Sequence, residues 1–183
     1  MKSLIAAASA AAAVAIAAPA FAQTSAMAPV TGYVDLGYSY ADTAITGLGT
    51  GGLNVLDGRI GAKFGRYIGA EGELGFGVGS KTIGGADVKL RSTYAGYAVG
   101  HLPLSPQAEL FARVGYGHSS IRASSAGLGG SVTTGTDSWN FGGGAEYFLT
   151  PHDGLRAEYT REDFRHDNGH ANVFAISYVR RFR

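Results

Sequence analysis

Hydrophobic and polar residues alternate along much of the chain, and residues 68–78 show the pattern most clearly. One residue parity there carries Leu74, Phe76 and Val78, whereas the other carries only glycine and the carboxylates Glu71 and Glu73. A period of two residues predicts a β-strand with two unlike faces. We therefore expect water or paired ions on one side of a sheet and an apolar medium on the other.

The two-faced pattern occurs eight times, in segments close to the roughly 9 to 11 residues that a tilted strand needs to cross the hydrocarbon of a membrane. The expected strands are residues 31–41, 55–64, 68–78, 88–100, 109–118, 138–149, 155–160 and 174–182. Short turns near residues 65–66, 101–106 and 151–154 alternate with longer loops at residues 42–54, 80–87, 119–136 and 163–170. This organisation predicts an all-β fold, an eight-stranded antiparallel transmembrane up-and-down β-barrel, with short turns in the periplasm and longer loops outside.

The first residues predict export. A short cationic start, Met1-Lys2, precedes an alanine-rich apolar run at residues 4–18, and Ala20-Phe21-Ala22 fits the small-x-small rule for cleavage. The run is too short for a membrane-spanning helix. We expect a cleaved signal peptide at residues 1–22, a short N-terminal lead at 23–29, and an outer-membrane β-barrel at 30–183.

Composition narrows the classes further. The 183 residues include no cysteine, which excludes disulfides, thioether-linked haem and lipoprotein acylation. A formal net charge of +1 argues against nucleic acid as a partner. The 29 glycines and the abundant tyrosine and phenylalanine are unusual for a soluble enzyme and suit a transmembrane barrel.

The polar parity of the expected strands carries both acids and bases. Because side chains just fill the interior of an eight-stranded barrel, these charges must pair with one another, and arginine suits this role since its planar guanidinium bridges two carboxylates. The expected lumen ion network comprises Asp35, Asp57, Arg59, Glu71, Glu73, Arg91, Arg113, Glu146, Arg156 and Glu158. The same inward parity includes Lys63, Lys89, Glu109 and Arg181. The alternative interpretation of these charges is the solvated face of a soluble sandwich.

Outward aromatic residues collect near the expected strand ends, which is typical of the two interfacial belts of a membrane barrel. The aromatic girdle is expected to include Tyr38, Tyr40, Tyr116 and Trp139 at the outer rim, and Phe64, Tyr147, Tyr178 and Phe182 toward the periplasm.

Four segments, residues 111–117, 142–147, 155–161 and 178–182, resemble the small outer-membrane β-barrel family. This family includes opacity-type surface antigens and the transmembrane domain of OmpA-like proteins. The resemblance implies insertion by the barrel-assembly machinery and adds possible adhesion or antigenic exposure of the loops. Members commonly end on an aromatic residue, whereas Arg183 follows Phe182 here. A peptidoglycan-binding domain is missing after the barrel, so we do not expect tethering to the cell wall.

The leading hypothesis is a monomeric, non-enzymatic barrel without a cofactor, which contacts outer-membrane lipid and lipopolysaccharide, supports envelope integrity and displays loops. A second hypothesis is a small pore for water, ions or small solutes, in which Arg113 exchanges between Glu71 and Glu146. The interior of such a barrel is polar, which permits conduction, yet narrow, which opposes it.

The third and least favoured hypothesis is a lipid A esterase at the outer rim, formed by His118, Ser120 and Asp137. The first two are similar to the His-x-Ser pattern of lipid A deacylase barrels, although Ile121 stands where asparagine usually follows the serine. A metal at His166, Asp167 and His170 is the last alternative. We expect none, because a well-spaced further ligand is missing and Asn168-Gly169 predicts a turn.

Overall fold

The computed structural model describes residues 29–45, 49–79, 81–83, 86–125, 130–165 and 169–182. The expected signal peptide at residues 1–22, most of the expected lead, and Arg183 lie outside the described residues, and so do His166 and Asp167. These expectations remain predictions.

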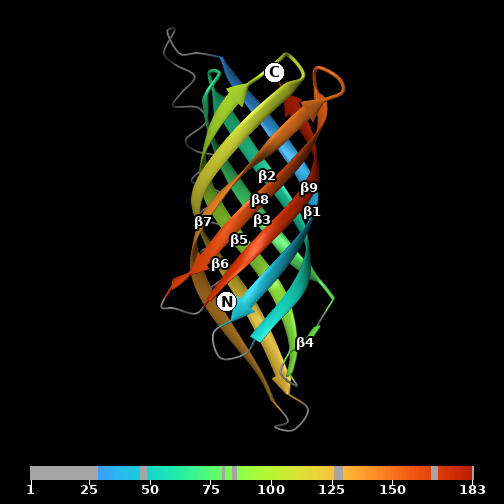
Figure 1. The fold of residues 1–183 in the computed structure, drawn as a ribbon, viewed down its shortest axis with the longest axis vertical. Helices are drawn as coiled ribbons and strands as arrows, with labels where there is room; N and C mark the ends of the chain where they lie inside the picture. Colours follow the sequence, from blue (N-terminus) through green and yellow to red (C-terminus); the bar gives the residue numbers. More distant parts are fainter. Residues whose placement is uncertain are drawn as a thin grey trace.

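In the described part of the chain, nine strands form one antiparallel sheet that closes on itself (Figure 1). They are β1 (Val30–Ile45), β2 (Gly49–Phe64), β3 (Ile68–Val78), β4 (Lys81–Ile83), β5 (Ala86–Pro103), β6 (Ala108–Ser125), β7 (Gly130–Phe148), β8 (Asp153–Phe164) and β9 (Gly169–Phe182). Each long strand pairs with its neighbours in sequence, and the pairs β1–β9 and β3–β5 close the barrel. The short β4 pairs only with β5, so the barrel has eight strands, as the sequence predicted.

The two ends of the barrel differ. The turn end, uppermost in Figure 1, holds the start of β1, the end of β9 and the short turns at residues 65–67, 104–107 and 149–152. The opposite loop end holds the C-terminal ends of β1, β3, β6 and β8. The strands extend further at the loop end than expected, since β6 and β7 pair as far as Ser125 and Gly130.

Local chemistry explains the short turns. Gly65 has a φ of 75°, a left-handed conformation that suits glycine. The hydroxyl of Ser105 accepts hydrogen bonds from the backbone N–H groups of Gln107 and Ala108. Thr150 repeats this arrangement at the β7–β8 turn. Side-chain oxygens therefore satisfy backbone donors that the turns would otherwise leave unpaired.

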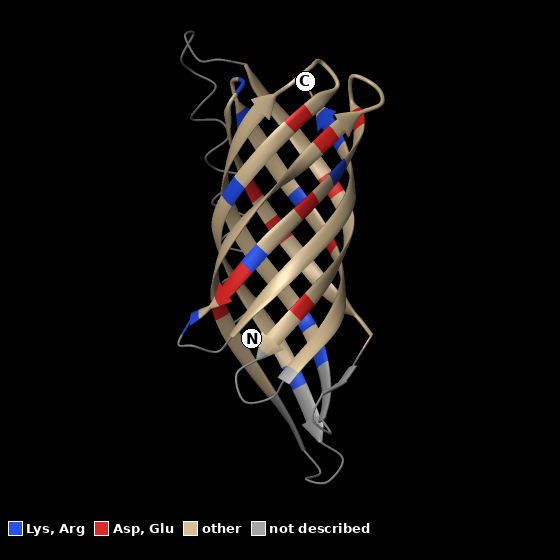
Figure 2. Cartoon of the chain, viewed as in Figure 1, with Lys and Arg blue, Asp and Glu red and all other residues tan. Residues whose placement is uncertain are grey.

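The interior is polar and the exterior is apolar. Arg156 and Val179 in the lumen are 1% and 0% exposed, whereas Leu36 and Ile176 on the outside are 62% and 69% exposed. Figure 2 shows acidic and basic positions along the whole height of the barrel. No helix among the described residues is long and apolar enough to span a membrane.

Small apolar clusters lie on both sides of the central lumen charges. Tyr33, Phe148 and Val179 pack together at the turn end. Leu53, Val55 and Leu90, with Ile121 against them, pack together at the loop end. The central charged side chains are therefore largely buried between apolar groups, which lowers the local dielectric and strengthens their ion pairs.

Candidate functional site

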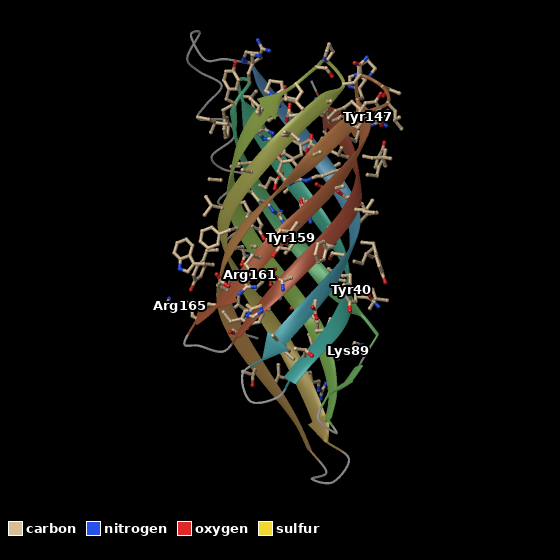
Figure 3. All side chains as sticks on the ribbon, viewed as in Figure 1. Tyr40, Lys89, Tyr147, Tyr159, Arg161 and Arg165 are labelled. Carbon is tan, nitrogen blue, oxygen red and sulfur yellow. The ribbon has the colours of Figure 1, made fainter. Side chains whose placement is uncertain are left out.

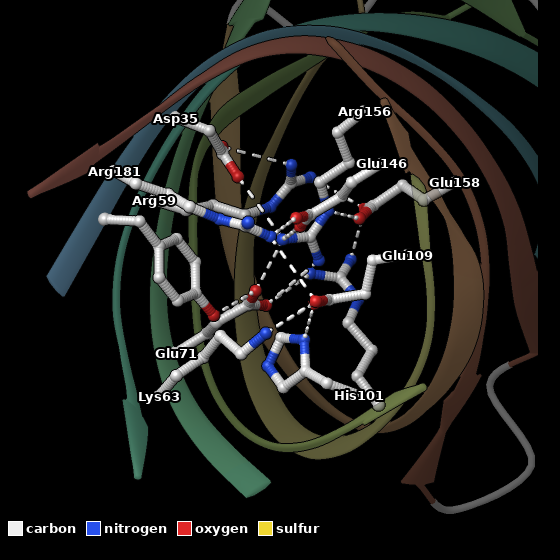
Figure 4. Close-up of polar contacts among 12 residues, drawn as sticks. Asp35, Arg59, Lys63, Glu71, His101, Glu109, Glu146, Arg156, Glu158 and Arg181 are labelled. Atoms are coloured by element: carbon white, nitrogen blue, oxygen red, sulfur yellow. Dashed lines mark hydrogen bonds and ion pairs between the residues drawn. The ribbon is translucent and has the colours of Figure 1, made fainter. Parts of the chain in front are cut away.

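Three arginines from different strands meet in the centre of the lumen. Arg59 comes from β2, Arg113 from β6 and Arg156 from β8, and each is 5% exposed or less. Strand alternation points all three inward, and the surrounding carboxylates come from β1, β2, β3, β7 and β8 (Figure 4). The network therefore ties together strands that are not neighbours in the sheet.

Arg59 bridges three carboxylates with three different nitrogen atoms. Its Nε donates to Glu73 Oε2 at 2.6 Å, its Nη2 to Glu158 Oε1 at 2.8 Å, and its Nη1 to Asp35 Oδ1 at 3.2 Å. Asp57 Oδ2 also lies 3.1 Å from Nη2. Each of the three guanidinium nitrogens thus donates to a different carboxylate, a planar arrangement that a lysine could not reproduce.

Arg156 forms the second centre of the network. Nη1 and Nη2 donate to the two oxygens of Glu71 at 2.5 and 3.2 Å, while Nε donates to Glu158 Oε2 at 2.9 Å. Nη1 also lies 3.4 Å from Glu146 Oε1, and the guanidinium carbon lies 3.9 Å from the centroid of the Phe111 ring. The pairing with Glu71 is the bidentate geometry that gives the strongest charge-assisted bonds.

Arg113 joins the other two arginines through shared acids. Its Nη1 donates to Glu73 Oε2 at 2.9 Å, and its Nη2 donates to Glu158 Oε1 at 2.6 Å and to Thr160 Oγ1 at 2.9 Å. The guanidinium lies 4.1 Å from the centroid of the Tyr97 ring. Glu158 therefore contacts all three arginines and is the shared acceptor of the network.

A second charge cluster fills the lumen nearer the turn end. Lys63 Nζ donates to both oxygens of Glu109, at 2.8 and 2.6 Å, and His101 Nδ1 lies 2.6 Å from the same carboxylate. Arg181 Nη2 lies 3.1 Å from Glu146 Oε2. Because Glu146 also contacts Arg156, it connects the two clusters.

The structure places nine of the ten expected network residues in the lumen and contradicts one, Arg91. Arg91 is exposed, and Lys89 on the same strand is exposed as well. A register shift between Leu90 and Ser92 interrupts the alternation of β5, so Leu90 turns inward in their place. The prediction of Arg91 as a lumen residue is therefore wrong.

Several lumen residues were not predicted. His101 was expected in a turn but lies in β5 and contacts Glu109. The hydroxyl of Tyr33 donates to Glu71 Oε1 at 2.8 Å. Glu162 lies two residues beyond Thr160 on β8 and therefore also faces the lumen. The inward parity of Glu162 was visible in the sequence, whereas the partners of His101 and Tyr33 depend on tertiary pairing.

The expected girdle aromatics lie on the outside of the barrel. Tyr38, Tyr40, Tyr116 and Trp139 are 38 to 52% exposed, and Tyr147, Tyr178 and Phe182 are 45 to 56% exposed. Phe64 is partly buried at the end of β2. Figure 3 shows Tyr147 near the turn end, with Tyr40 and Tyr159 closer to the loop end.

Of the three rim residues considered for an esterase, His118 and Asp137 are in contact, whereas Ser120 is not bonded to them. His118 Nδ1 lies 2.7 Å from Asp137 Oδ1, and the imidazole stacks on Tyr94 with ring centroids 5.3 Å apart. Ser120 forms no hydrogen bond with either residue in the described part of the chain. Nor do the described residues contain a group of three or more His, Asp or Glu side chains arranged to hold a metal ion.

A closed sheet with a charged lumen and an apolar exterior defines a small transmembrane β-barrel. The chain belongs to the outer membrane protein beta-barrel domain family, which matches residues 8–182. The protein is accordingly an outer-membrane protein. No curated protein matches the chain in sequence.

Solved structures share this fold at low sequence identity. The chain is similar to Neisserial surface protein A (NspA), with a TM-score of 0.66 and 13% identity over 82% of this chain and 97% of the other. It is also similar to Ail, the attachment invasion locus protein of Yersinia pestis, with a TM-score of 0.65 and 18% identity over 83% and 98%. OprG of Pseudomonas aeruginosa is similar as well, with a TM-score of 0.54 and 12% identity over 86% of this chain and 97% of the other. At these identities the likeness shows the fold alone.

Proposed function

We propose that the protein is a non-conducting outer-membrane barrel that contributes to envelope structure and presents its loop end to the outside. The observation that carries this proposal is the junction of Arg59, Arg113 and Arg156 across the lumen. Their guanidinium groups and the shared carboxylates occupy the axis along which a solute would have to pass. An eight-stranded barrel leaves little further room for a water-filled path.

The proposed surroundings of the barrel follow from its surface. The exposed apolar side chains between the two aromatic belts fit contact with outer-membrane lipid and lipopolysaccharide, and insertion by the barrel-assembly machinery fits the fold. We expect a monomer, because the ion pairs of the lumen form within one chain, and a structural role calls for no catalytic cofactor. At the loop end, β6 and β7 extend beyond Tyr116 and Trp139 and form the part available for display.

A small pore is the second candidate, and one feature favours it. A cavity of about 50 Å³ lies in the loop half of the lumen and reaches down to Glu73. If the ion pairs below it exchanged partners, water could continue past Arg113.

Planar-bilayer recording separates the two candidates. We expect the native protein, once its folded state is confirmed by its heat-modifiable mobility on a gel, to give no channel steps. The Arg113→Ala variant removes a guanidinium from the centre and is expected to give small steps. Arg161→Ala removes an arginine from the outer surface instead and serves as the matched control. It should give no channel steps. Reproducible unitary steps from the native protein would overturn the proposed closed state.

A further inference from the structure

The central lumen holds more carboxylates than cations. Only Arg59, Arg113 and Arg156 provide positive charge there among the described residues. They are faced by six acids, Asp35, Asp57, Glu71, Glu73, Glu158 and Glu162. The cluster at the turn end does not compensate, because Lys63 and Arg181 there are matched by Glu109 and Glu146. An uncompensated surplus of negative charge in a desolvated lumen is strongly unfavourable.

The surplus lies on the side of the network that faces the loop end. The cavity of about 50 Å³ is lined there by the carboxylates of Asp57, Glu73 and Glu162. Its other polar lining consists of hydroxyl groups, from Ser39, Thr43, Thr93 and Ser119. The remaining lining residues are apolar, so among the described residues every polar side chain at this cavity offers oxygen atoms and none carries a nitrogen donor.

One of these carboxylates, Glu162, lies outside the network, and another, Asp57, is only partly used by it. Asp57 is 3% exposed, and its Oδ1 has no hydrogen-bond partner. Its Oδ2 has an ion-pair contact with Arg59 at 3.1 Å but no hydrogen bond. Glu162 forms no hydrogen bond or ion pair with another described residue. A buried carboxylate with an unpartnered oxygen, such as Asp57, is stabilised by a further compensating charge.

We propose that this cavity binds a partly hydrated divalent cation that prefers oxygen ligands, such as Ca²⁺ or Mg²⁺, between Asp57 and Glu162. Carboxylates, hydroxyls and water are the ligands such cations take. Low-dielectric walls concentrate the field of the acids on the cavity and attract a cation. A cavity of about 10–15 Å³ measured with a water-sized probe holds one water molecule, so the 50 Å³ here leaves room for an ion with a few water molecules.

The geometry also limits how the cation is held. No three acids or histidines in the described residues are arranged for direct metal ligation, so hydroxyl groups and retained water complete the coordination. The hydroxyl of Ser119 donates to Thr93 Oγ1 at 3.0 Å, which keeps two of these oxygens together on the cavity wall. The inference rests on this arrangement of oxygens and holds whether or not the lumen conducts.

Isothermal titration calorimetry with CaCl₂ and with MgCl₂ tests the proposal directly. The protein is folded in zwitterionic detergent, which offers no anionic headgroup, and is freed of metal with EDTA. We expect about one divalent ion per native chain, and an affinity at least about tenfold weaker in Glu162→Gln and in Asp57→Asn. Asp42→Asn, which removes an exposed carboxylate from the outer face of β1, should bind as the native protein does.

Thermal unfolding supplies a second readout that does not depend on calorimetric heat. Without metal, Glu162→Gln should unfold at a higher temperature than the native protein, because it relieves repulsion among the acids. Added Ca²⁺ should raise the midpoint of the native protein by clearly more than that of Glu162→Gln at the same concentration. The proposal is overturned if neither ion binds, or if both variants bind with native affinity. It is equally overturned if only acidification, and no cation, stabilises the native protein, since protons would then neutralise the surplus.

Discussion

Arg156→Ala is expected to lower the free energy of unfolding by about 3–5 kcal/mol. Arg156 is 1% exposed and holds Glu71 through two hydrogen bonds and Glu158 through a third. Its loss leaves these carboxylates, which are 4% and 7% exposed, in the buried centre of a lumen where the acids already outnumber the bases. The large penalty therefore comes from the buried carboxylates that lose their partner. The net contribution of the intact ion pairs is small, because the cost of desolvating the charges largely offsets their attraction.

The measurement is equilibrium unfolding in urea, followed by the mobility shift between the folded and unfolded bands. Arg180→Ala is the matched control, because Arg180 lies on the same wall of the barrel but points outward, with a side chain that is 52% exposed. Its ion pair with Asp153 at 3.0 Å is exposed as well, and such pairs contribute about 0–1 kcal/mol. If Arg156→Ala and Arg180→Ala lowered the free energy of unfolding by the same amount, the lumen would not be desolvated.

Ile176→Arg is expected to destabilise the barrel folded in lipid vesicles by about 2–4 kcal/mol. Ile176 is 69% exposed on β9 and pairs with Tyr38 and Ala157 of the flanking strands. In water an exposed arginine would be harmless. The penalty arises only if this position faces hydrocarbon, where a guanidinium loses its hydration.

The same unfolding measurement applies here, with vesicles in place of detergent. Gln107→Arg introduces the same side chain into the exposed turn between β5 and β6 and should change stability by less than about 0.5 kcal/mol. A loss at Gln107 as large as at Ile176 would mean that the outer wall near Ile176 is not in contact with lipid.

The alternation of side chains predicted most of the architecture because it is set locally. Each strand of a barrel shows one face to lipid and one to the lumen, so residue parity alone indicates where Glu73, Arg113 and Glu158 point. The structure agrees, since all three are buried and joined by hydrogen bonds. Parity does not reveal which acid meets which base, because partners come from strands on opposite sides of the lumen.

Interruptions of the alternation could not be found in this way. Lys89 and Arg91 have the spacing of inward residues, yet the register shift between Leu90 and Ser92 turns them outward. That shift depends on how β5 pairs with β6, which the sequence of β5 does not specify. The consequence is chemical as well as geometric, because two expected bases leave the lumen and its acids remain in excess.

The strands also extend further toward the loop end than the sequence predicted. Membrane thickness limits how long a strand must be, but not how far a hairpin continues beyond the bilayer. Most of the expected loop at residues 119–136 is in fact β6 and β7, paired through Thr133 and Thr134, residues that suit strands. Similarly, β1 and β2 pair as far as Ile45 and Gly49 inside the expected loop at residues 42–54.

The central claim is that the barrel is apolar outside and ionic inside, and spin labels along β9 test it most directly. The chain has no cysteine, so single-cysteine variants from Phe174 to Tyr178 can each carry one nitroxide label. In lipid vesicles, collision with dissolved oxygen should be high at Phe174, Ile176 and Tyr178 and low at Ala175 and Ser177. Equal collision rates along the strand, or higher rates at Ala175 and Ser177, would contradict the account.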